Sequence, residues 1–280
     1  MDSHVFLAVI LAGALHAGWN LIIKLDMDRF LALFLIQTLM GVMGLAMLAV
    51  FPLAASASWP YALASGAIHL GYYTFLSKSY RVGDLSQVYP IARGGAPLLT
   101  FIGVFVLLGE ALKPAAAFGV FMLIAGIWLT ARACGKALKL DGMTIVCALG
   151  TSVFIAAYTL VDGLGGRASD SIGSYSALVF VLDALFLFIF GVATRGIGIV
   201  RQIAPAWKLG VLGAALSAGA YWIVIWAMSV AHIAAVAALR ETGIVFVVIM
   251  SALVLKEKVT PLRGFGALII IVGAAALRLA

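Results

Sequence analysis

The 280-residue chain is poor in charged residues, cysteine and histidine. Charged residues make up 10% of it and hydrophobic residues 65%, whereas a soluble domain is roughly 45–50% apolar. The two cysteines, Cys134 and Cys147, form no metal-binding or redox spacing and are expected to pack as small apolar residues. The four histidines are scattered and supply neither a nucleophile–base pair nor a metal cluster. The sequence therefore argues against an enzyme and predicts no cofactor.

Long apolar runs take the place of these missing features. A helix needs roughly 20 apolar residues to cross a bilayer core. Continuous runs without alternation favour helices over a barrel, and the first run lacks the basic flank of a signal peptide. The interpretation is an all-α integral membrane bundle of ten transmembrane helices with no separate soluble domain. The expected spans are 4–23, 30–50, 59–79, 86–108, 114–132, 142–161, 173–193, 207–229, 233–255 and 261–279.

The net charge of +7 is concentrated in the connections between these spans, where it indicates topology rather than a nucleic-acid partner. The opposite set of connections and the C-terminal end hold Lys113, Arg167 and Arg278. By the positive-inside rule, the odd-numbered connections are cytoplasmic and both termini lie outside the cytoplasm, across a bacterial-type inner membrane. The odd-numbered connections carry Lys24, Arg29, Lys78, Arg81, Arg132, Lys136, Lys139, Arg195, Arg201, Lys208, Lys256, Lys258 and Arg263.

An internal repeat sets the architecture: residues 72–126 recur at residues 219–273. The halves are expected to be 1–139 and 140–280. Each holds five helices, an odd number, so the second copy is inverted relative to the first. Inverted repeats are typical of secondary transporters with a site near the midplane between the halves and alternating access. The alternative is a duplicated scaffold without transport. The matching pairs are Arg93 and Arg240, Glu110 and Glu257, Pro114 and Pro261, Gly119 and Gly266, and Gly126 and Gly273.

Short motifs near the ends of spans 4 and 9 carry a resemblance to a known family. Leu107, Gly109 and Glu110 precede Pro114 and Gly119, and the same order recurs in the second half, with Lys256 in place of Gly109. With span 1, whose His16, Trp19 and Asn20 precede Lys24, the chain resembles the drug/metabolite transporter superfamily, specifically its EamA-type members. The resemblance implies ten helices in two five-helix repeats, and export or import of amino acids, nucleotide sugars, organic phosphates or drugs.

Four charged residues clearly lie at membrane depth within the expected spans: Arg93, Asp183, Arg240 and Glu241. Burying such groups costs about 2.5–3.5 kcal/mol each on insertion scales, so each needs a reason. They either form two structural ion pairs or line a polar cavity that contacts substrate or a coupling proton. From helical rise the two arginines should lie roughly 12 Å apart along the membrane normal. Glu241, Asp183 and His16 are the candidates for proton coupling.

Backbone chemistry points to a break in span 4. Pro90, Pro97 and the pair Gly94–Gly95 lie within eight residues, which should kink or interrupt the helix. Span 9 keeps only Gly243 near Arg240. The glycine-rich segment Asp162–Arg167 lacks the context of a phosphate loop and is interpreted as a flexible turn.

Aromatic and polar side chains gather in spans 1, 3, 6 and 8, within the membrane interior rather than at its interfaces. For a single aromatic, plain core packing is an equal alternative. Two arginines match a carboxylate or phosphate, while the aromatics equally suit an amphipathic drug or an aromatic amino acid. The substrate-binding candidates are His16, Trp19, Asn20, His69, Tyr72, Tyr73, Tyr89, Arg93, Tyr158, Tyr221, Trp222 and Arg240.

The sequence as a whole favours a carrier. No nucleotide-binding motif is present, so ion or solute gradients would supply the energy. We expect secondary-active transport of a small metabolite such as an amino acid or organic anion, with export as a candidate direction. The expected partners are the substrate, the lipid bilayer and, as a candidate coupling ion, the proton, in a monomer or weak oligomer without nucleic acid. A membrane-embedded enzyme and a non-transporting scaffold are the alternatives.

Overall fold

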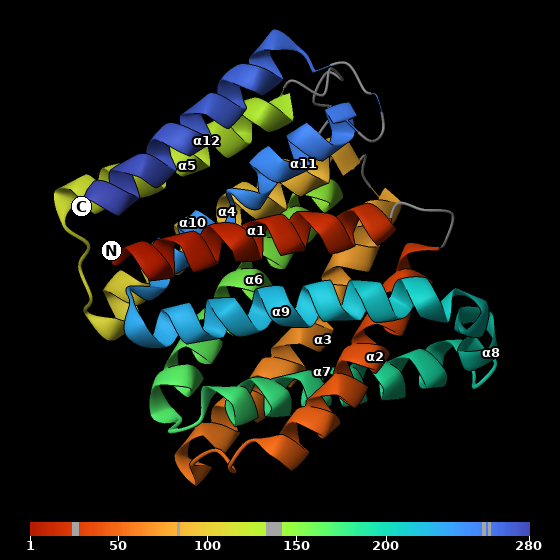
Figure 1. Cartoon of the computed structure of the whole chain (residues 1–280). Coiled ribbons are helices and arrows are strands. Elements are labelled where there is room, and N and C mark those ends of the chain that lie inside the picture. Colours follow the sequence, from red (N-terminus) through yellow and green to blue (C-terminus); the bar gives the residue numbers. More distant parts are fainter. Residues whose placement is uncertain (24–27, 83–84, 133–141, 254–255, 257–258) are drawn as a thin grey trace. The chain divides into compact units, whose positions relative to one another are not determined.

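The computed structural model describes residues 1–23, 28–82, 85–132, 142–253, 256 and 259–280 (Figure 1). Within these ranges the chain is helical and contains no strand, which confirms the all-α prediction. The long helices are α1 (Ser3–Ile23), α2 (Arg29–Val50), α3 (Trp59–Val82), α4 (Leu85–Leu108), α5 (Pro114–Arg132), α6 (Gly142–Ala168), α7 (Ile172–Arg195), α9 (Trp207–Val230) and α12 (Pro261–Leu279). Shorter elements are η1 (Ser56–Ser58), α8 (Ile199–Ile203), η2 (Ala204–Ala206), α10 (Ile233–Arg240) and α11 (Gly243–Leu253).

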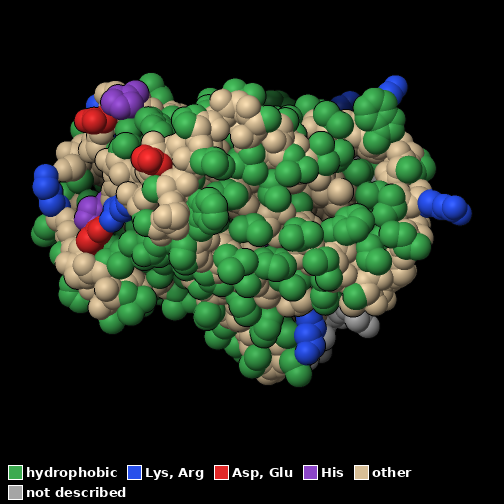
Figure 2. All heavy atoms as spheres, turned by 90° about the horizontal axis from the view of Figure 1, so that it is seen from below, with side chains coloured by type: hydrophobic (Ala, Val, Ile, Leu, Met, Phe, Trp, Pro, Cys, Tyr) green, Lys and Arg blue, Asp and Glu red, His purple; other side chains and the backbone are tan. Residues whose placement is uncertain are grey.

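Nine stretches of the described residues are long and apolar enough to cross a membrane. The predicted span that is missing from this set is α3, which has the length but carries Ser65, His69, Tyr72 and Tyr73. Large hydrophobic side chains such as Leu45, Phe105 and Leu268 point outward, and green side chains dominate the face shown in Figure 2. An apolar exterior of this extent suits lipid rather than water. The chain is a multi-pass membrane protein.

Local side-chain chemistry sets the helix starts. Asp28 accepts hydrogen bonds from the backbone N–H groups of Phe30 and Leu31, both at 3.1 Å, and so caps α2. Thr260 accepts from the N–H of Arg263 at 3.3 Å and caps α12, whose first residue is Pro261. A capping oxygen satisfies an N–H that has no partner within the helix, and proline at the first position loses no helical hydrogen bond.

The Asp162–Arg167 segment is helical, so its prediction as a flexible turn is wrong. It forms the last turns of α6, which continues to Ala168. A Cβ on Gly165 would meet the hydroxyl of Tyr175, and one on Gly166 would lie 3.2 Å from the side chain of Ile225. The two glycines therefore admit neighbouring side chains against α6 instead of bending the chain.

The helix break lies in span 9, whereas the sequence pointed to span 4. α4 runs without interruption through Pro90 and Pro97. The hydroxyl of Ser152 on α6 donates to the carbonyl oxygens of Ile91 and Ala92, at 3.0 and 3.2 Å. A Cβ on Gly95 would lie 2.7 Å from that hydroxyl, so the glycine is needed for its approach. Two carbonyls of α4 thus receive an additional donor from α6.

Span 9 divides into α10 and α11 at Glu241 and Thr242. The N–H groups of Glu241, Thr242 and Ile244 donate three residues back, each at 3.0 Å, which is the tighter 3₁₀ pattern. A Cβ on Gly243 would lie 2.9 Å from the carbonyl oxygen of Gly13, so α1 packs directly against this backbone. The single glycine of span 9 therefore marks the break through a close helix contact, a cause that the local sequence does not reveal.

The helices form two compact units, each built from both halves of the sequence. Unit 1 comprises Met1–Ala14, Gly71–Leu160 and Ala231–Ala280, and unit 2 comprises Leu15–Leu70 and Val161–Val230. The repeat halves 1–139 and 140–280 remain a prediction from the sequence. Cys147, in unit 1, is buried as expected, while Cys134 and the loop residues Lys24, Lys136, Lys139, Glu257 and Lys258 lie outside the described residues.

In unit 1, α5 and α12 pack along one another in opposite directions (Figure 1). A Cβ on Gly119 would lie 2.9 Å from the carbonyl oxygen of Gly273, and one on Gly266 would lie 2.9 Å from that of Gly126. Small residues thus let the two backbones approach closely. At the end of this pair, Arg278 donates to the carbonyl oxygen of Met1 at 2.8 Å, and the two termini lie together.

In unit 2, α2 packs against α7 and α9. A Cβ on Gly41 would collide with Ala184, and one on Gly44 would lie 2.8 Å from the carbonyl oxygen of Ala177. The core beside this contact contains Met40, Phe180, Ala214 and Ala218. The result is a tightly packed group of helices that holds the polar side chains described below.

Candidate functional site

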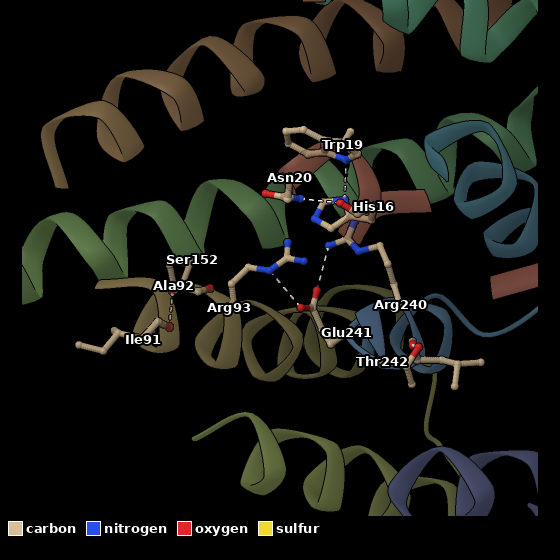
Figure 3. A network of polar contacts seen from close by, with 11 residues as sticks. His16, Trp19, Asn20, Ile91, Ala92, Arg93, Ser152, Arg240, Glu241 and Thr242 are labelled. Carbon is tan, nitrogen blue, oxygen red and sulfur yellow. Dashed lines mark hydrogen bonds and ion pairs between the residues drawn. The ribbon is translucent and has the colours of Figure 1, made fainter. Parts of the chain in front are cut away.

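Unit 1 holds a buried trio of charged side chains (Figure 3). The Nε of Arg93 lies 3.1 Å from Oε2 of Glu241, and Nη2 of Arg240 lies 3.5 Å from Oε1 of the same carboxylate. Glu241 is fully buried, and the two arginines are 8% and 5% exposed. Arg93 comes from the middle of α4, while Arg240 is the last residue of α10 and Glu241 its C-terminal cap. The break in span 9 thus positions the acid between two guanidinium groups.

The two arginines share one partner. Helical rise predicts a separation of roughly 12 Å along the membrane normal for their positions on the helices, and their guanidinium groups contact opposite oxygens of one carboxylate. In the alternative of two separate ion pairs each arginine would have its own acid, whereas Glu241 contacts both arginines. Asp183, in unit 2, accepts a hydrogen bond from Gln37 at 3.0 Å. Long arginine side chains can reach across several ångströms, which is why backbone height does not predict the distance between their charges.

The trio carries a formal charge of +1, from two guanidinium groups and one carboxylate. Among the described residues of unit 1, these three are the buried charged side chains. A planar guanidinium presents several N–H donors in a fork that matches a carboxylate or a phosphate. The arrangement therefore suits a negatively charged group.

An aromatic group in unit 1 contains three of the predicted tyrosines. The ring of Tyr72 lies 5.1 Å from that of Tyr73 and 5.9 Å from that of Tyr158, the latter in an edge-to-face arrangement. Tyr73 and Tyr158 are buried, and Tyr72 is partly exposed. Tyr89 lies on α4, but its side chain is outside the described residues.

In unit 2, His16, Trp19 and Asn20 form a local cluster on α1. The indole N–H of Trp19 donates to Nδ1 of His16 at 3.2 Å, and the amide of Asn20 donates to the carbonyl oxygen of His16 at 2.7 Å (Figure 3). All three are partly exposed. His16 and Asn20 are one helical turn apart, and their link runs through the backbone of His16 rather than its ring.

A second polar cluster of unit 2 surrounds Asp162. Both its carboxylate oxygens are engaged: Tyr175 donates to Oδ1 at 3.2 Å, and Tyr221 donates to Oδ2. The Tyr221 hydroxyl also lies 3.4 Å from Nε2 of His69. His69 and Tyr221 were predicted as site residues, and the structure brings them together. Trp222, the next residue along α9, is 37% exposed and packs edge-to-face on Phe51.

Sequence reasoning missed Asp162 because the glycines after it suggested a turn. The residues Thr151, Ile155, Thr159, Asp162 and Gly166 follow helical spacing, and all of them are buried. This three- and four-residue spacing places them on one face of a helix that continues through the glycines. The pattern could have identified both the longer α6 and its buried acid.

The fold and these buried charge clusters define a multi-pass α-helical membrane protein with polar groups inside the bundle. The EamA-like transporter family model matches residues 142–279. The resemblance drawn from the sequence motifs is thereby confirmed: the second half of the chain is similar to a family of membrane transporters of small molecules.

A solved crystal structure of a protein has a similar fold, with a TM-score of 0.78 and 18% sequence identity, over 100% of this chain and 99% of that chain. No curated protein matches the sequence. Within the described residues, no group of three or more His, Cys, Asp or Glu side chains is placed to hold a metal ion.

Proposed function

We propose that the protein is a secondary-active transporter of a small metabolite that carries a carboxylate or phosphate, such as an amino acid or an organic anion. The observation that carries this proposal is the sharing of Glu241 by Arg93 and Arg240. If each arginine had its own acid, the trio's charge would be balanced and an anion would gain little there. With one acid between two arginines, an anion completes the charge balance.

Burial makes this charge imbalance significant. Interactions between charges are stronger in a low-dielectric interior than in water. An anion that meets two guanidinium groups there can form charge-assisted hydrogen bonds with both. Glu241 would then keep the arginines in place when substrate is absent, because it contacts both of them from the cap of α10.

We further propose that the two sequence halves are inverted repeats that support alternating access. Gly119 and Gly266 are equivalent in the repeat, as are Gly126 and Gly273, and their contacts are crossed: Gly119 meets Gly273 and Gly126 meets Gly266. Crossed contacts between equivalent positions are what a twofold relation produces. Two equivalent arginines that reach one acid agree with the same relation.

The proposal can be tested on purified full-length protein by thermal-shift screening. The probes are amino acids, dicarboxylates and sugar phosphates, each beside a neutral amide or unphosphorylated analogue. At least one anionic probe should raise the melting temperature while its neutral analogue does not. Arg93→Gln and Arg240→Gln should each abolish that shift, whereas Arg201→Gln, at an exposed position on α8, should retain it. The stabilising probe should then enter proteoliposomes that contain the wild-type protein.

A double variant separates substrate binding from structure. Arg240→Gln with Glu241→Gln leaves Arg93 without the acid between the two arginines. If this variant keeps both wild-type stability and uptake of the anionic probe, the arginines are structural and the anion proposal fails. Uptake of neutral or cationic aromatic compounds alone would instead favour the tyrosine group of Tyr72, Tyr73 and Tyr158 as the main recognition element.

A further inference from the structure

The Asp162 cluster of unit 2 is a chain of titratable groups linked by hydrogen bonds. It runs from Asp162 on α6 through the hydroxyl of Tyr221 on α9 to the ring of His69 on α3. Tyr175 on α7 donates to the second oxygen of Asp162 at 3.2 Å. Asp162 and Tyr175 are fully buried, His69 is 6% exposed, and Tyr221 is partly exposed. Tyr221 is therefore the member of the chain nearest to an exposed surface.

The contacts of His69 with Ser65 indicate which ring nitrogen carries a proton. Nδ1 lies 2.9 Å from the carbonyl oxygen of Ser65 and 3.2 Å from the hydroxyl oxygen of the same residue. A carbonyl can only accept a hydrogen bond, whereas a hydroxyl can accept or donate. We assign a proton to Nδ1, because both contacts are then hydrogen bonds. The other ring nitrogen, Nε2, faces the Tyr221 hydroxyl at 3.4 Å, and it can either accept from that hydroxyl or, when protonated, donate to it.

The Tyr221 hydroxyl has one proton and two neighbours, so the protonation of the ends is coupled. If Tyr221 donates to Asp162, a hydrogen bond with His69 requires a proton on Nε2, which gives an imidazolium and a carboxylate. If Tyr221 donates to His69, a hydrogen bond with Asp162 requires a protonated carboxyl. Both arrangements hold the same number of protons and complete every hydrogen bond of the chain.

Removing one proton leaves a defect in either arrangement. With Asp162 ionised and His69 neutral, the single Tyr221 proton serves one neighbour, and a lone pair then faces a lone pair at the other. A buried polar contact without its proton costs free energy, so the chain favours one bound proton.

We propose that Asp162, Tyr221 and His69 form a proton-binding site that holds one exchangeable proton. Transfer is balanced within the chain: the N–H bond of His69 Nε2 breaks as an O–H bond forms on Tyr221, and the original Tyr221 O–H bond breaks as one forms on Asp162. Tyr175 positions the carboxyl through Oδ1. Resting on the proposed transport function, this site supplies the coupling proton in place of the sequence candidates Glu241, Asp183 and His16.

Further ionisable groups lie on α1, α3, α6 and α7. On α3, Tyr61 lies near Tyr175. On α6, Arg167 donates to the carbonyl oxygen of Met228 at 3.1 Å. On α7, Asp183 accepts from Gln37, and on α1, His16 accepts from Trp19.

The test is pH-step infrared difference spectroscopy on the purified full-length protein, which follows carboxyl and imidazole bands together and needs no substrate. In the wild type, one carboxyl signal and one histidine signal should change in the same pH step. Asp162→Asn should abolish that carboxyl signal and shift the histidine step. Tyr221→Phe, which removes only the hydroxyl, should separate the two steps. The Phe variant keeps the test available if the Asn variant does not fold.

A matched variant at a competing acid provides the control. Asp183→Asn should retain the coupled carboxyl and histidine step. The proposal is overturned if Asp162→Asn leaves the wild-type spectrum unchanged, if Tyr221→Phe leaves the two signals coupled, or if the carboxyl signal belongs to Asp183. Because no substrate enters this experiment, its failure leaves the thermal-shift test of anion binding unaffected.

The transport consequence is measured separately. With an anionic probe that the wild type transports in proteoliposomes, Asp162→Asn should lose uphill uptake driven by a pH gradient but keep exchange of labelled for unlabelled probe. Loss of both processes in a folded Asp162→Asn protein, or uphill uptake at the wild-type rate, would contradict proton coupling at this site.

Discussion

Gly109 and Lys256, which are 147 positions apart and equivalent in the sequence repeat, both adopt a left-handed backbone, with φ of 66° and 53°. Gly109 follows α4 and Lys256 follows α11, so the equivalent position after each span has a left-handed backbone. Glycine adopts this conformation without steric cost, whereas a residue with a Cβ does not. Lys256 stands where the first copy of the motif has Gly109, and it therefore adopts a backbone conformation that is unfavourable for a residue with a Cβ.

Lys256→Gly should stabilise the protein by roughly 1 kcal/mol, because the left-handed conformation costs a lysine about that much. Gly109→Ala should destabilise it by a similar amount. Thermal unfolding in detergent measures both. Gly142→Ala is the matched control, since Gly142 has no positive φ and a Cβ there meets no atom within 4 Å. An unchanged melting temperature in both test variants would show that the turn relaxes without cost.

Gly266→Ala should destabilise the contact between α5 and α12. The added Cβ would lie 2.6 Å from the backbone nitrogen of Thr130 and 2.9 Å from the carbonyl oxygen of Gly126, so whole helices would have to move. Overpacking of this kind costs about 1–3 kcal/mol. Gly264→Ala, two residues earlier on α12 and in open space, should be neutral or stabilising. Equal melting temperatures for these two alanine variants would argue against the close packing.

Glu241→Gln should be strongly destabilising. It removes the carboxylate that contacts Arg93 and Arg240 and leaves two buried guanidinium groups together. Removing one partner from a buried ion pair costs about 3–5 kcal/mol. Glu110→Gln is the control: its pair with His232, at 3.4 Å, is about one-third exposed, and such pairs contribute roughly 0–1 kcal/mol. Chemical denaturation of both variants would reveal the difference, and similar losses would contradict a special role for Glu241.

Reporter fusions test the topology. A reporter that is active only outside the cytoplasm should be active after Ala280 and silent in the connection between residues 132 and 139. Lys113 donates to the carbonyl oxygen of Ala280 at 3.3 Å, and Arg278 contacts Met1, so these groups share one end of unit 1. A reporter inserted after Ala111 should therefore match the one after Ala280. The reverse pattern would show that the distribution of lysine and arginine does not set the orientation.

The helical spans and the family could be predicted from the sequence because they depend on features that lie along the chain. Spanning a bilayer requires a run of about 20 apolar residues, and such runs are visible without any tertiary information. The start of α12 at Pro261 and the close packing at Gly119 and Gly126 follow from local chemistry and from helical spacing in the same way. The motifs around Gly109 and Glu110 indicate the family because their residues are neighbours in the chain.

The partners of the buried charges were decided only by the tertiary structure. Glu241 lies between Arg93 and Arg240, because a break in span 9 caps α10 with the acid and α4 brings Arg93 to it. The Asp162 cluster joins side chains from α3, α7 and α9. The two residues of each hydrogen bond in it lie between 13 and 152 positions apart in the sequence. Local spacing determines which face of a helix a residue occupies, but helix packing determines which faces meet, and the long polar side chains then select partners within their reach.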